Sequence, residues 1–237
     1  MNSNVVIIGK VCKGFEARDA GDKKVGRFSV VVNTGKQDAE GKDVGAFYEI
    51  ESWNDKQHDA YRDFVKVGDL VAVKGNLSID TYEKSDGGKG TSLKIKNPDV
   101  TFLGQAKSPG MATITAVGRL TRDVETKELD GGKKVANFTV AANDGGKEDS
   151  ANFLNVELWN DRTKAAEFLQ KGSLISVSGK LNIDTYEKSD GGKGISAKIS
   201  NPEIVFLDKK REDGGKAPAE FDKIKAPAAN KSAGNSK

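Results

Sequence analysis

Six aromatic residues recur at matching places along the chain, each among polar neighbours: Phe47, Trp53, Tyr82, Phe153, Trp159 and Tyr186. Successive residues of a β-strand point to opposite faces of the sheet. In segment 153–159 one face is then wholly apolar, while the other carries Phe153 and Trp159 beside Asn155 and Glu157. A Phe-sized side chain held in water forgoes roughly 1.5–3 kcal/mol of burial free energy. Repeated exposure therefore indicates a binding role for these side chains. Stacking of one nucleic-acid base on an aromatic ring contributes about 1–3 kcal/mol.

The first half of the chain repeats this division between a core face and an open face. In segment 47–53, Phe47, Glu49, Glu51 and Trp53 are expected outward, and the residues between them inward. The strand that follows in each half predicts a core row made of Leu77, Ile79, Leu181, Ile183 and Thr185. Its outward row is Asn76, Ser78, Asp80, Tyr82, Lys180, Asn182, Asp184 and Tyr186.

Basic residues near these rows are candidates for contacts to a phosphate backbone. They are Arg27, Lys74, Lys84, Lys89, Lys94, Lys96, Lys180, Lys188, Lys193 and Lys198. Gly-Gly-Lys-Gly at 87–90 and 191–194 places lysines at flexible hairpin tips. These turns join strands, whereas a phosphate-binding loop precedes a helix N-terminus.

Plainer interpretations stay open for each group. Trp53 and Trp159 each end a strand before a helix, so they can instead pack under that helix. Tyr82 and Tyr186 can be ordinary cross-strand partners, and the loop lysines can simply solubilise the protein because carboxylates surround them.

Charge is distributed evenly over most of the chain. The 237 residues carry a net charge of +3, and this excess lies in 208–237, because 1–103 and 104–207 are each neutral. Bulk attraction therefore does not argue for nucleic-acid binding, which must come from local placement.

The single cysteine and single histidine limit the possible chemistry. Cys12 has no partner for an internal disulfide, and with His58 it cannot form a Cys/His zinc site, so we expect no metal and no cofactor. Cys12 is expected to be buried in a strand and His58 to be a solvated helix residue. We find no nucleophile–base pair and expect no enzymatic activity.

An internal repeat decides the architecture. LSIDTYEKSDGGKG at 77–90 returns as LNIDTYEKSDGGKG at 181–194, and Trp-Asn-Asp at 53–55 returns at 159–161. Each copy predicts five strands with a helix between the third and fourth, which is the order of an OB-fold barrel. The expected strands are 4–12, 25–33, 46–53, 69–79 and 91–103, then 112–118, 135–143, 151–159, 173–183 and 195–207, with helices at 55–66 and 161–171.

We therefore predict an all-β protein with two tandem OB-fold five-stranded barrels. Residues 1–103 form the first domain, 104–112 the linker and 113–207 the second domain. Residues 208–237 are rich in Lys, Ala, Gly, Asn and Ser and are expected to be a disordered tail. No apolar run approaches the roughly 18 residues that span a bilayer, so we expect no membrane partner and a cytoplasmic, nucleoid-associated location.

The combination of motifs resembles the bacterial-type single-stranded DNA-binding proteins. The resemblance rests on VVIIGKV, VGRFSVVVN, FYEIESWND and VGDLVAVKGNLSIDTYEKSDGGKG, and on their counterparts in the second copy. It covers nearly all of 4–207 and implies the tandem variety of this family. The family's base-stacking aromatics fall on Phe47, Trp53 and Tyr82, and on Phe153, Trp159 and Tyr186.

The resemblance implies sequence-tolerant binding of single-stranded DNA in replication, recombination or repair, by a homodimer with four OB domains. This sequence departs from the family in three ways. No aromatic occurs in 34–45 or 144–150, and Glu49, Glu51 and Glu157 occupy the binding face. The tail ends in AANKSAGNSK, so recruitment of repair proteins through an acidic tip is not supported.

Two rival functions stay open at this point: an RNA-binding OB protein and a protein-interaction module. Within the favoured interpretation we expect unequal barrels. The first has two glutamates between its aromatics and the second has one, so we predict that the second binds more tightly.

Overall fold

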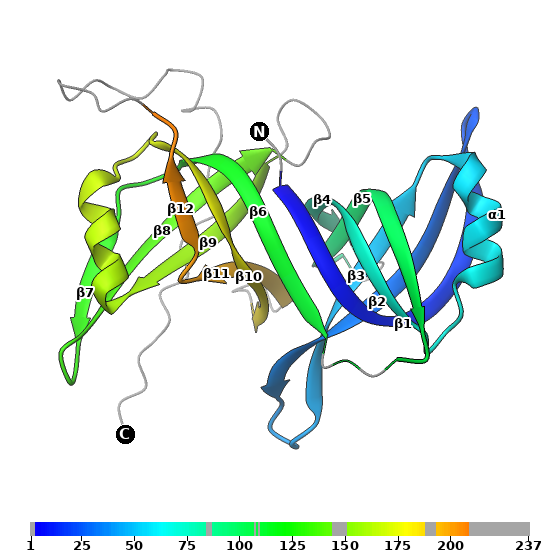
Figure 1. Cartoon of the computed structure of the whole chain (residues 1–237), viewed down its shortest axis with the longest axis horizontal. Helices are drawn as coiled ribbons and strands as arrows, with labels where there is room; N and C mark the ends of the chain where they lie inside the picture. Colours follow the sequence, from blue (N-terminus) through cyan, green and yellow to red (C-terminus); the bar gives the residue numbers. More distant parts are fainter. Residues whose placement is uncertain are drawn as a thin grey trace.

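Two β-barrels stand side by side in the computed structural model, which describes residues 3–83, 87–106, 108, 110–143, 151–187 and 193–208 (Figure 1). The first contains β1 (Ser3–Ala20), β2 (Lys23–Gln37), β3 (Asp43–Ser52), α1 (Asp55–Phe64), β4 (Leu70–Glu83) and β5 (Lys89–Gly104). The second contains β6 (Met111–Leu120), β7 (Glu125–Leu129), β8 (Lys133–Asn143), β9 (Ala151–Trp159), η1 (Asn160–Phe168), β10 (Leu174–Glu187), β11 (Lys193–Ser200) and β12 (Glu203–Phe206). The predicted all-β class is confirmed. Apart from Asp208, the expected disordered tail lies outside the described residues.

The strand pairing closes each barrel. In the first, β1 pairs with β2 and β4, β2 with β3, β4 with β5, and β3 runs parallel to β5. The second barrel repeats this with β6, β8, β9, β11 and β10. A helix follows the third strand in both, so the predicted OB-fold order is confirmed.

In the second copy, the first and the last strand are each interrupted, which the sequence did not predict. The long strand β1 corresponds to two strands, β6 and β7, because residues 121–124 leave the sheet. Its last strand is likewise split into β11 and β12 at Asn201, which has a φ of +48°. In the first barrel Asn97, at φ +51°, makes only a bulge within β5.

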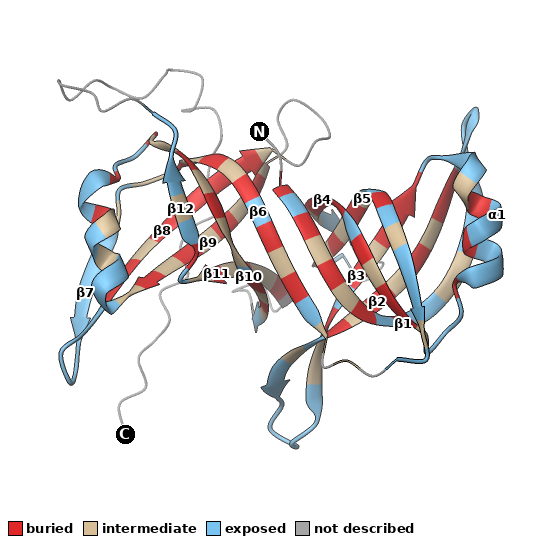
Figure 2. Ribbon diagram, viewed as in Figure 1, coloured by how far each residue is buried: buried red, intermediate tan, exposed pale blue. Residues whose placement is uncertain are grey.

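Alternation of side chains fills the barrel interiors, as the banded burial along β1 and β6 shows (Figure 2). Tyr48, Ile50 and Ser52 are buried, as are Leu154, Val156 and Leu158, which confirms the predicted core rows. Three details of the alternation are wrong. Thr185 is exposed because β10 has by then passed beyond the barrel into the hairpin, and Ser78 is buried where Asn152 of the second barrel bonds the backbone on either side of it. Glu51 is 5% exposed, because it bonds with Arg27 and Trp53.

Two further expectations are corrected. Cys12 is exposed, because it follows Val11 on the opposite face of β1. His58 is 4% exposed, and its Nε2 lies 3.1 Å from the Ser52 carbonyl oxygen. Its ring packs 5.3 Å from that of Phe15, so this helix side chain belongs to the core.

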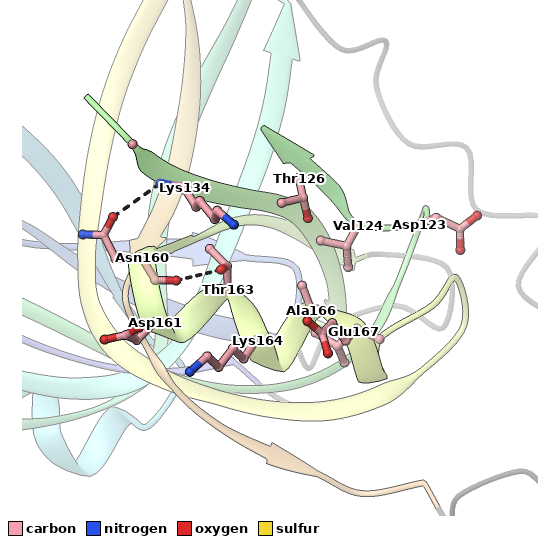
Figure 3. Close-up of a pocket in the computed structure, with 12 residues that line it drawn as sticks. Asp123, Val124, Thr126, Lys134, Asn160, Asp161, Thr163, Lys164, Ala166 and Glu167 are labelled. Carbon is pink, nitrogen blue, oxygen red and sulfur yellow. Dashed lines mark hydrogen bonds between the residues drawn. The ribbon is translucent and has the colours of Figure 1, made fainter. Parts of the chain in front are cut away.

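The second helix is shorter and of 3-10 type. In the first barrel, the ring of Tyr61 on α1 packs 5.9 Å from that of Phe15 on β1. The repeat places the smaller Val124 and Ala165 at these positions. A pocket of about 730 Å³ lies between η1 and the β7–β8 hairpin, with Val124 in its wall (Figure 3).

The two barrels are joined by antiparallel pairing of β1 with β6, which lie adjacent in the centre of Figure 1. Val5 pairs with Ile114, and these two residues occupy equivalent places, since they face the equivalent Gly75 and Gly179 on β4 and β10. The join therefore has an approximate twofold axis through Val5 and Ile114. It merges all twelve strands into one continuous sheet.

Candidate nucleic-acid interface

The predicted aromatics lie on an open side of each barrel. We call Phe47, Glu49, Glu51, Trp53 and Tyr82 the first aromatic face, and Phe153, Asn155, Glu157, Trp159 and Tyr186 the second aromatic face. The exposed fractions of Phe47, Trp53, Tyr82 and Tyr186 are 63%, 45%, 50% and 38%. Phe153 and Trp159 are half-buried. Trp53 thus stands on the open side rather than under α1.

Both hairpin tyrosines rest on a glycine. Tyr82 pairs with Gly90 across the β4–β5 ladder, and Tyr186 pairs with Gly194 across β10–β11. A Cβ added at Gly90 or Gly194 would lie 2.5 Å from the Cζ atom of the facing tyrosine. Each ring therefore covers glycine backbone with one side while its other side stays available. Cross-strand packing of these tyrosines accounts for the ring face that contacts glycine. It does not account for the exposed ring face.

The glutamates of the first aromatic face are paired with arginine. Arg27 lies directly opposite Glu51 in the β2–β3 ladder, and its Nη2 donates to Glu51 Oε2 at 2.9 Å. Arg27 Nη1 also lies 3.8 Å from Glu49 Oε1. The Nε1 of Trp53 donates to the other oxygen of Glu51 at 2.9 Å. Arg27 therefore compensates the charge of Glu51 within the protein and lies close enough to offset part of that of Glu49.

The neighbouring strand adds a second ion pair to this face. Lys94 lies 2.9 Å from Asp80 Oδ2, and the Ser78 hydroxyl donates to Asp80 Oδ1 at 2.6 Å. Burial favours the neutral carboxyl, but the bonds from Ser78 and Lys94 and the charges of Lys94 and Lys96 outweigh it, so the pKa of Asp80 lies below its usual value. Asp80 is therefore an ionised, paired group beside the first aromatic face.

The second aromatic face is less charged. Glu157 pairs with Lys198 at 2.7 Å, and Asn137 stands at the place of Arg27. Where the first face has Glu49, the second has Asn155, which accepts from Thr139 at 3.1 Å and donates to Ser196 at 3.0 Å. This neutral network escaped the sequence reasoning, which followed aromatics and charges.

The predicted basic residues separate into several groups. Arg27, Lys94, Lys96 and Lys198 lie on strands of the two aromatic faces. Lys74 and Lys180 are exposed where β4 and β10 pair with β1 and β6, and Lys89 is exposed at the hairpin. Lys84, Lys188 and the Lys193 side chain lie outside the described residues.

A cation that the sequence reasoning missed links the two barrels. Lys36, on the β2–β3 hairpin of the first barrel, forms an ion pair with Asp184 of the second. Asp184 also lies 3.9 Å from Lys198. Only the tertiary arrangement brings these residues together, since 148 positions separate Lys36 from Asp184.

The pocket between η1 and the β7–β8 hairpin offers no competing site of comparable character. Its lining comes from η1 and the β7–β8 hairpin, and includes Lys134, Lys164, Asp161 and Glu167 (Figure 3). Among the described residues that line it, none is aromatic and none is His or Cys. The aromatic faces therefore remain the candidate interface. No helix in the described part of the chain is long and apolar enough to cross a membrane.

Two closed barrels with aromatic side chains on open strand faces define a tandem OB-fold protein of the nucleic-acid-binding class. A model of the single-strand binding protein family matches residues 2–103 and again residues 111–207. The chain belongs to this family, and the resemblance noted in the sequence is confirmed, including the tandem arrangement.

Individual relatives cover different parts of the chain. The single-stranded DNA-binding protein of Deinococcus radiodurans is 25% identical over 161 residues, which are 60% of this chain and 54% of that protein. Single-stranded DNA-binding protein 1 of Clostridium acetobutylicum is 32% identical over 108 residues, which are 43% of this chain and 98% of that protein. The chain thus spans about half of the former and nearly all of the latter.

A solved structure shares the whole two-barrel fold. The crystal structure of the wild-type single-stranded DNA binding protein from Thermus aquaticus has a TM-score of 0.60 to this chain. The similarity covers 90% of this chain and 96% of that one at 17% sequence identity.

Proposed function

We propose that this member of the family binds single-stranded DNA without sequence preference, by stacking bases on both aromatic faces. The observation that carries the proposal is the exposure of Phe47, Trp53, Tyr82 and Tyr186 at repeated positions of two barrels. Stacking tolerates any base, because every base has a π-face. Phe47 lies on β3 and Trp53 directly follows the end of that strand, and six residues of extended chain span about 20 Å, so the two rings contact different bases.

Charge has a secondary part in this mechanism. Arg27, Lys94 and Lys198 already have carboxylate partners, so phosphates gain less from them than from free cations. Lys74, Lys89 and Lys180 are the exposed basic residues that we expect to contact the backbone. Lys84, Lys188 and Lys193 stay predicted contacts on the basis of the sequence alone. Residues 1–103 and 113–207 each form one binding unit, joined by 104–112.

The biological role follows from the ligand. Binding protects single strands during replication, recombination or repair, in the cytoplasm and at the nucleoid. The protein acts without catalysis and without a cofactor.

We further infer a homodimer that brings four barrels together. The outer face of β4, β1, β6 and β10 supports this, because Val6, Ile8 and Val117 are half-buried at its centre, while the exposed Lys74 and Lys180 lie at its two edges. Sedimentation equilibrium of the full chain is expected to give twice the 25.3 kDa chain mass. A monomer at micromolar concentration would contradict it.

Competition between nucleic acids tests the ligand class. Labelled oligo(dT) bound to the protein is challenged with unlabelled DNA, RNA and duplex DNA of equal length. We expect single-stranded DNA to compete best. Tighter binding of RNA would favour an RNA-binding OB protein, and no binding of any nucleic acid would favour a protein-interaction module.

A further inference from the structure

Glu51 is the most enclosed carboxylate of the first aromatic face. Its side chain is 7% exposed, although the sequence alternation places it outward. One carboxylate oxygen accepts from Trp53 and the other from Arg27, each at 2.9 Å. A buried carboxylate is stable only when it is paired and hydrogen-bonded, and both conditions are met here.

The contact with Trp53 restricts a side chain that is otherwise half exposed. The indole N–H can only donate, and Glu51 supplies a fixed acceptor. Glu51 is itself held from β2 by Arg27, whose guanidinium also lies 3.8 Å from Glu49. The β2–β3 ladder thus fixes Arg27, Arg27 holds Glu51, and Glu51 in turn restrains the indole ring of Trp53.

The second barrel lacks this arrangement. Glu157 pairs with Lys198, and Asn137 replaces Arg27. Over the part of the chain that the structure describes, the indole N–H of Trp159 has no acceptor, whereas its backbone N–H donates to Asn201 Oδ1 at 2.9 Å. The two tryptophans are thus equivalent in sequence and different in restraint.

We propose that Glu51 is a positioning residue, which holds the Trp53 indole in the orientation that stacks on a base. This inference rests on the proposed function. It means that a carboxylate, whose negative charge alone would weaken DNA binding, instead strengthens binding by orienting Trp53. Ordering an interface side chain before binding removes an entropic cost that corresponds to about a 2- to 12-fold change in affinity.

The test uses Trp53 as the only tryptophan, in a Trp159→Phe background of the full chain. Glu51→Leu removes both hydrogen bonds, whereas Glu51→Gln keeps an acceptor for the indole. We expect Glu51→Leu to lower the fluorescence anisotropy of Trp53 in the free protein and to weaken oligo(dT) binding about 2- to 12-fold. Glu51→Gln is expected to recover most of both, and Glu157→Leu is the matched control for the anisotropy of Trp53.

The outcomes separate this inference from the proposed function. Unchanged anisotropy in Glu51→Leu, or tighter DNA binding, would overturn the positioning role. Absence of any fluorescence change with oligo(dT) in the background protein would overturn the proposed function, while the anisotropy of the free protein still reports on Glu51. If Glu51→Leu does not fold, Arg27→Lys loosens the same carboxylate. It is expected to lower the anisotropy, and no change would count against the inference.

Discussion

Asn152 of the second barrel accepts a hydrogen bond of 2.9 Å from the backbone N–H of Ile79 in the first. Its amide nitrogen donates to the Leu77 carbonyl at 2.6 Å and to the Ser3 hydroxyl at 3.2 Å. The side chain is 1% exposed, so it is a buried polar link between the barrels. The approximate twofold axis places Ala46 at the equivalent site, where a pocket of about 290 Å³ lies instead. The join between barrels is thus symmetric in backbone and asymmetric in side chains.

Replacing this link is expected to destabilise the protein. Asn152→Ala leaves buried partners on β1 and β4 unsatisfied, and each such group costs about 1–3 kcal/mol. We expect the free energy of unfolding to fall by about 2–4 kcal/mol in urea denaturation followed by circular dichroism. Asn4→Ala, at an exposed position of the same join, is the control and is expected to change it by less than about 0.5 kcal/mol. Equal effects of the two substitutions would contradict this account.

The sequence predicted correctly which side chains of a strand face outward, wherever the strand alone determines this. Alternation alone placed Phe47, Trp53 and Tyr82 outward, because the period of a strand is fixed by backbone geometry. It was wrong where another element intervenes. Ser78 is covered by the second barrel, and Glu51 is enclosed by Arg27 from β2 and by Trp53.

The burial of the helix residue His58 and the pairing of the glutamates on the first aromatic face could not be predicted from the sequence. His58 reads as a solvated residue, since the sequence does not show that Phe15 packs against its ring. The expectation of a tighter second barrel counted Glu49 and Glu51 as free charges. Because Arg27 pairs with Glu51 and lies 3.8 Å from Glu49, the charge difference between the two faces is smaller than the sequence suggests, and the relative affinity of the barrels stays a prediction.

Gly90 sets the position of the Tyr82 ring. A methyl group in Gly90→Ala would lie 2.5 Å from the ring, so the ring must move off the backbone that it covers. We expect weaker oligo(dT) binding, by about 1 kcal/mol. In a Tyr82→Ala background the same substitution is expected to have no further effect, which a double-mutant cycle measures. Gly14→Ala, where the added methyl meets nothing within 4 Å, is the control. Additive effects of the Gly90 and Tyr82 substitutions would refute the coupling.

The depressed pKa of Asp80 predicts a pH dependence of stability. A carboxyl whose pKa is lower in the folded state stabilises it fully above the unfolded value of about 3.9, and this contribution is lost as the pH falls through the folded value. Asp80→Asn should therefore lose less stability than the parent during acid titration below about pH 4. Ser78→Ala, which removes one bond to Asp80, should behave intermediately. Identical acid profiles for all three proteins would disprove the assignment.

The internal ion pairs predict a shallow salt dependence. Each phosphate neutralised on a single strand contributes a slope of about −0.7 in a plot of log K against log salt concentration. Since Arg27, Lys94 and Lys198 are already paired, only the other lysines contribute, and we expect a total slope between about −2 for three contacts and about −4 for six. Glu157→Gln removes the closer of the two carboxylates beside Lys198 and is expected to steepen the slope. A parental slope steeper than about −5 would show that charge dominates.

The most direct test of the account is titration of the protein with poly(dT) while the fluorescence of its two tryptophans is followed. Base stacking on Trp53 and Trp159 predicts strong, saturable quenching. Trp53→Ala and Trp159→Ala should each weaken binding about 5- to 150-fold while the protein stays folded. Phe64→Ala, at an exposed aromatic on α1 whose ring packs against Phe102 and belongs to neither aromatic face, should leave binding unchanged. Absence of quenching at low salt, or unaltered affinity in both tryptophan variants, would contradict the stacking mechanism.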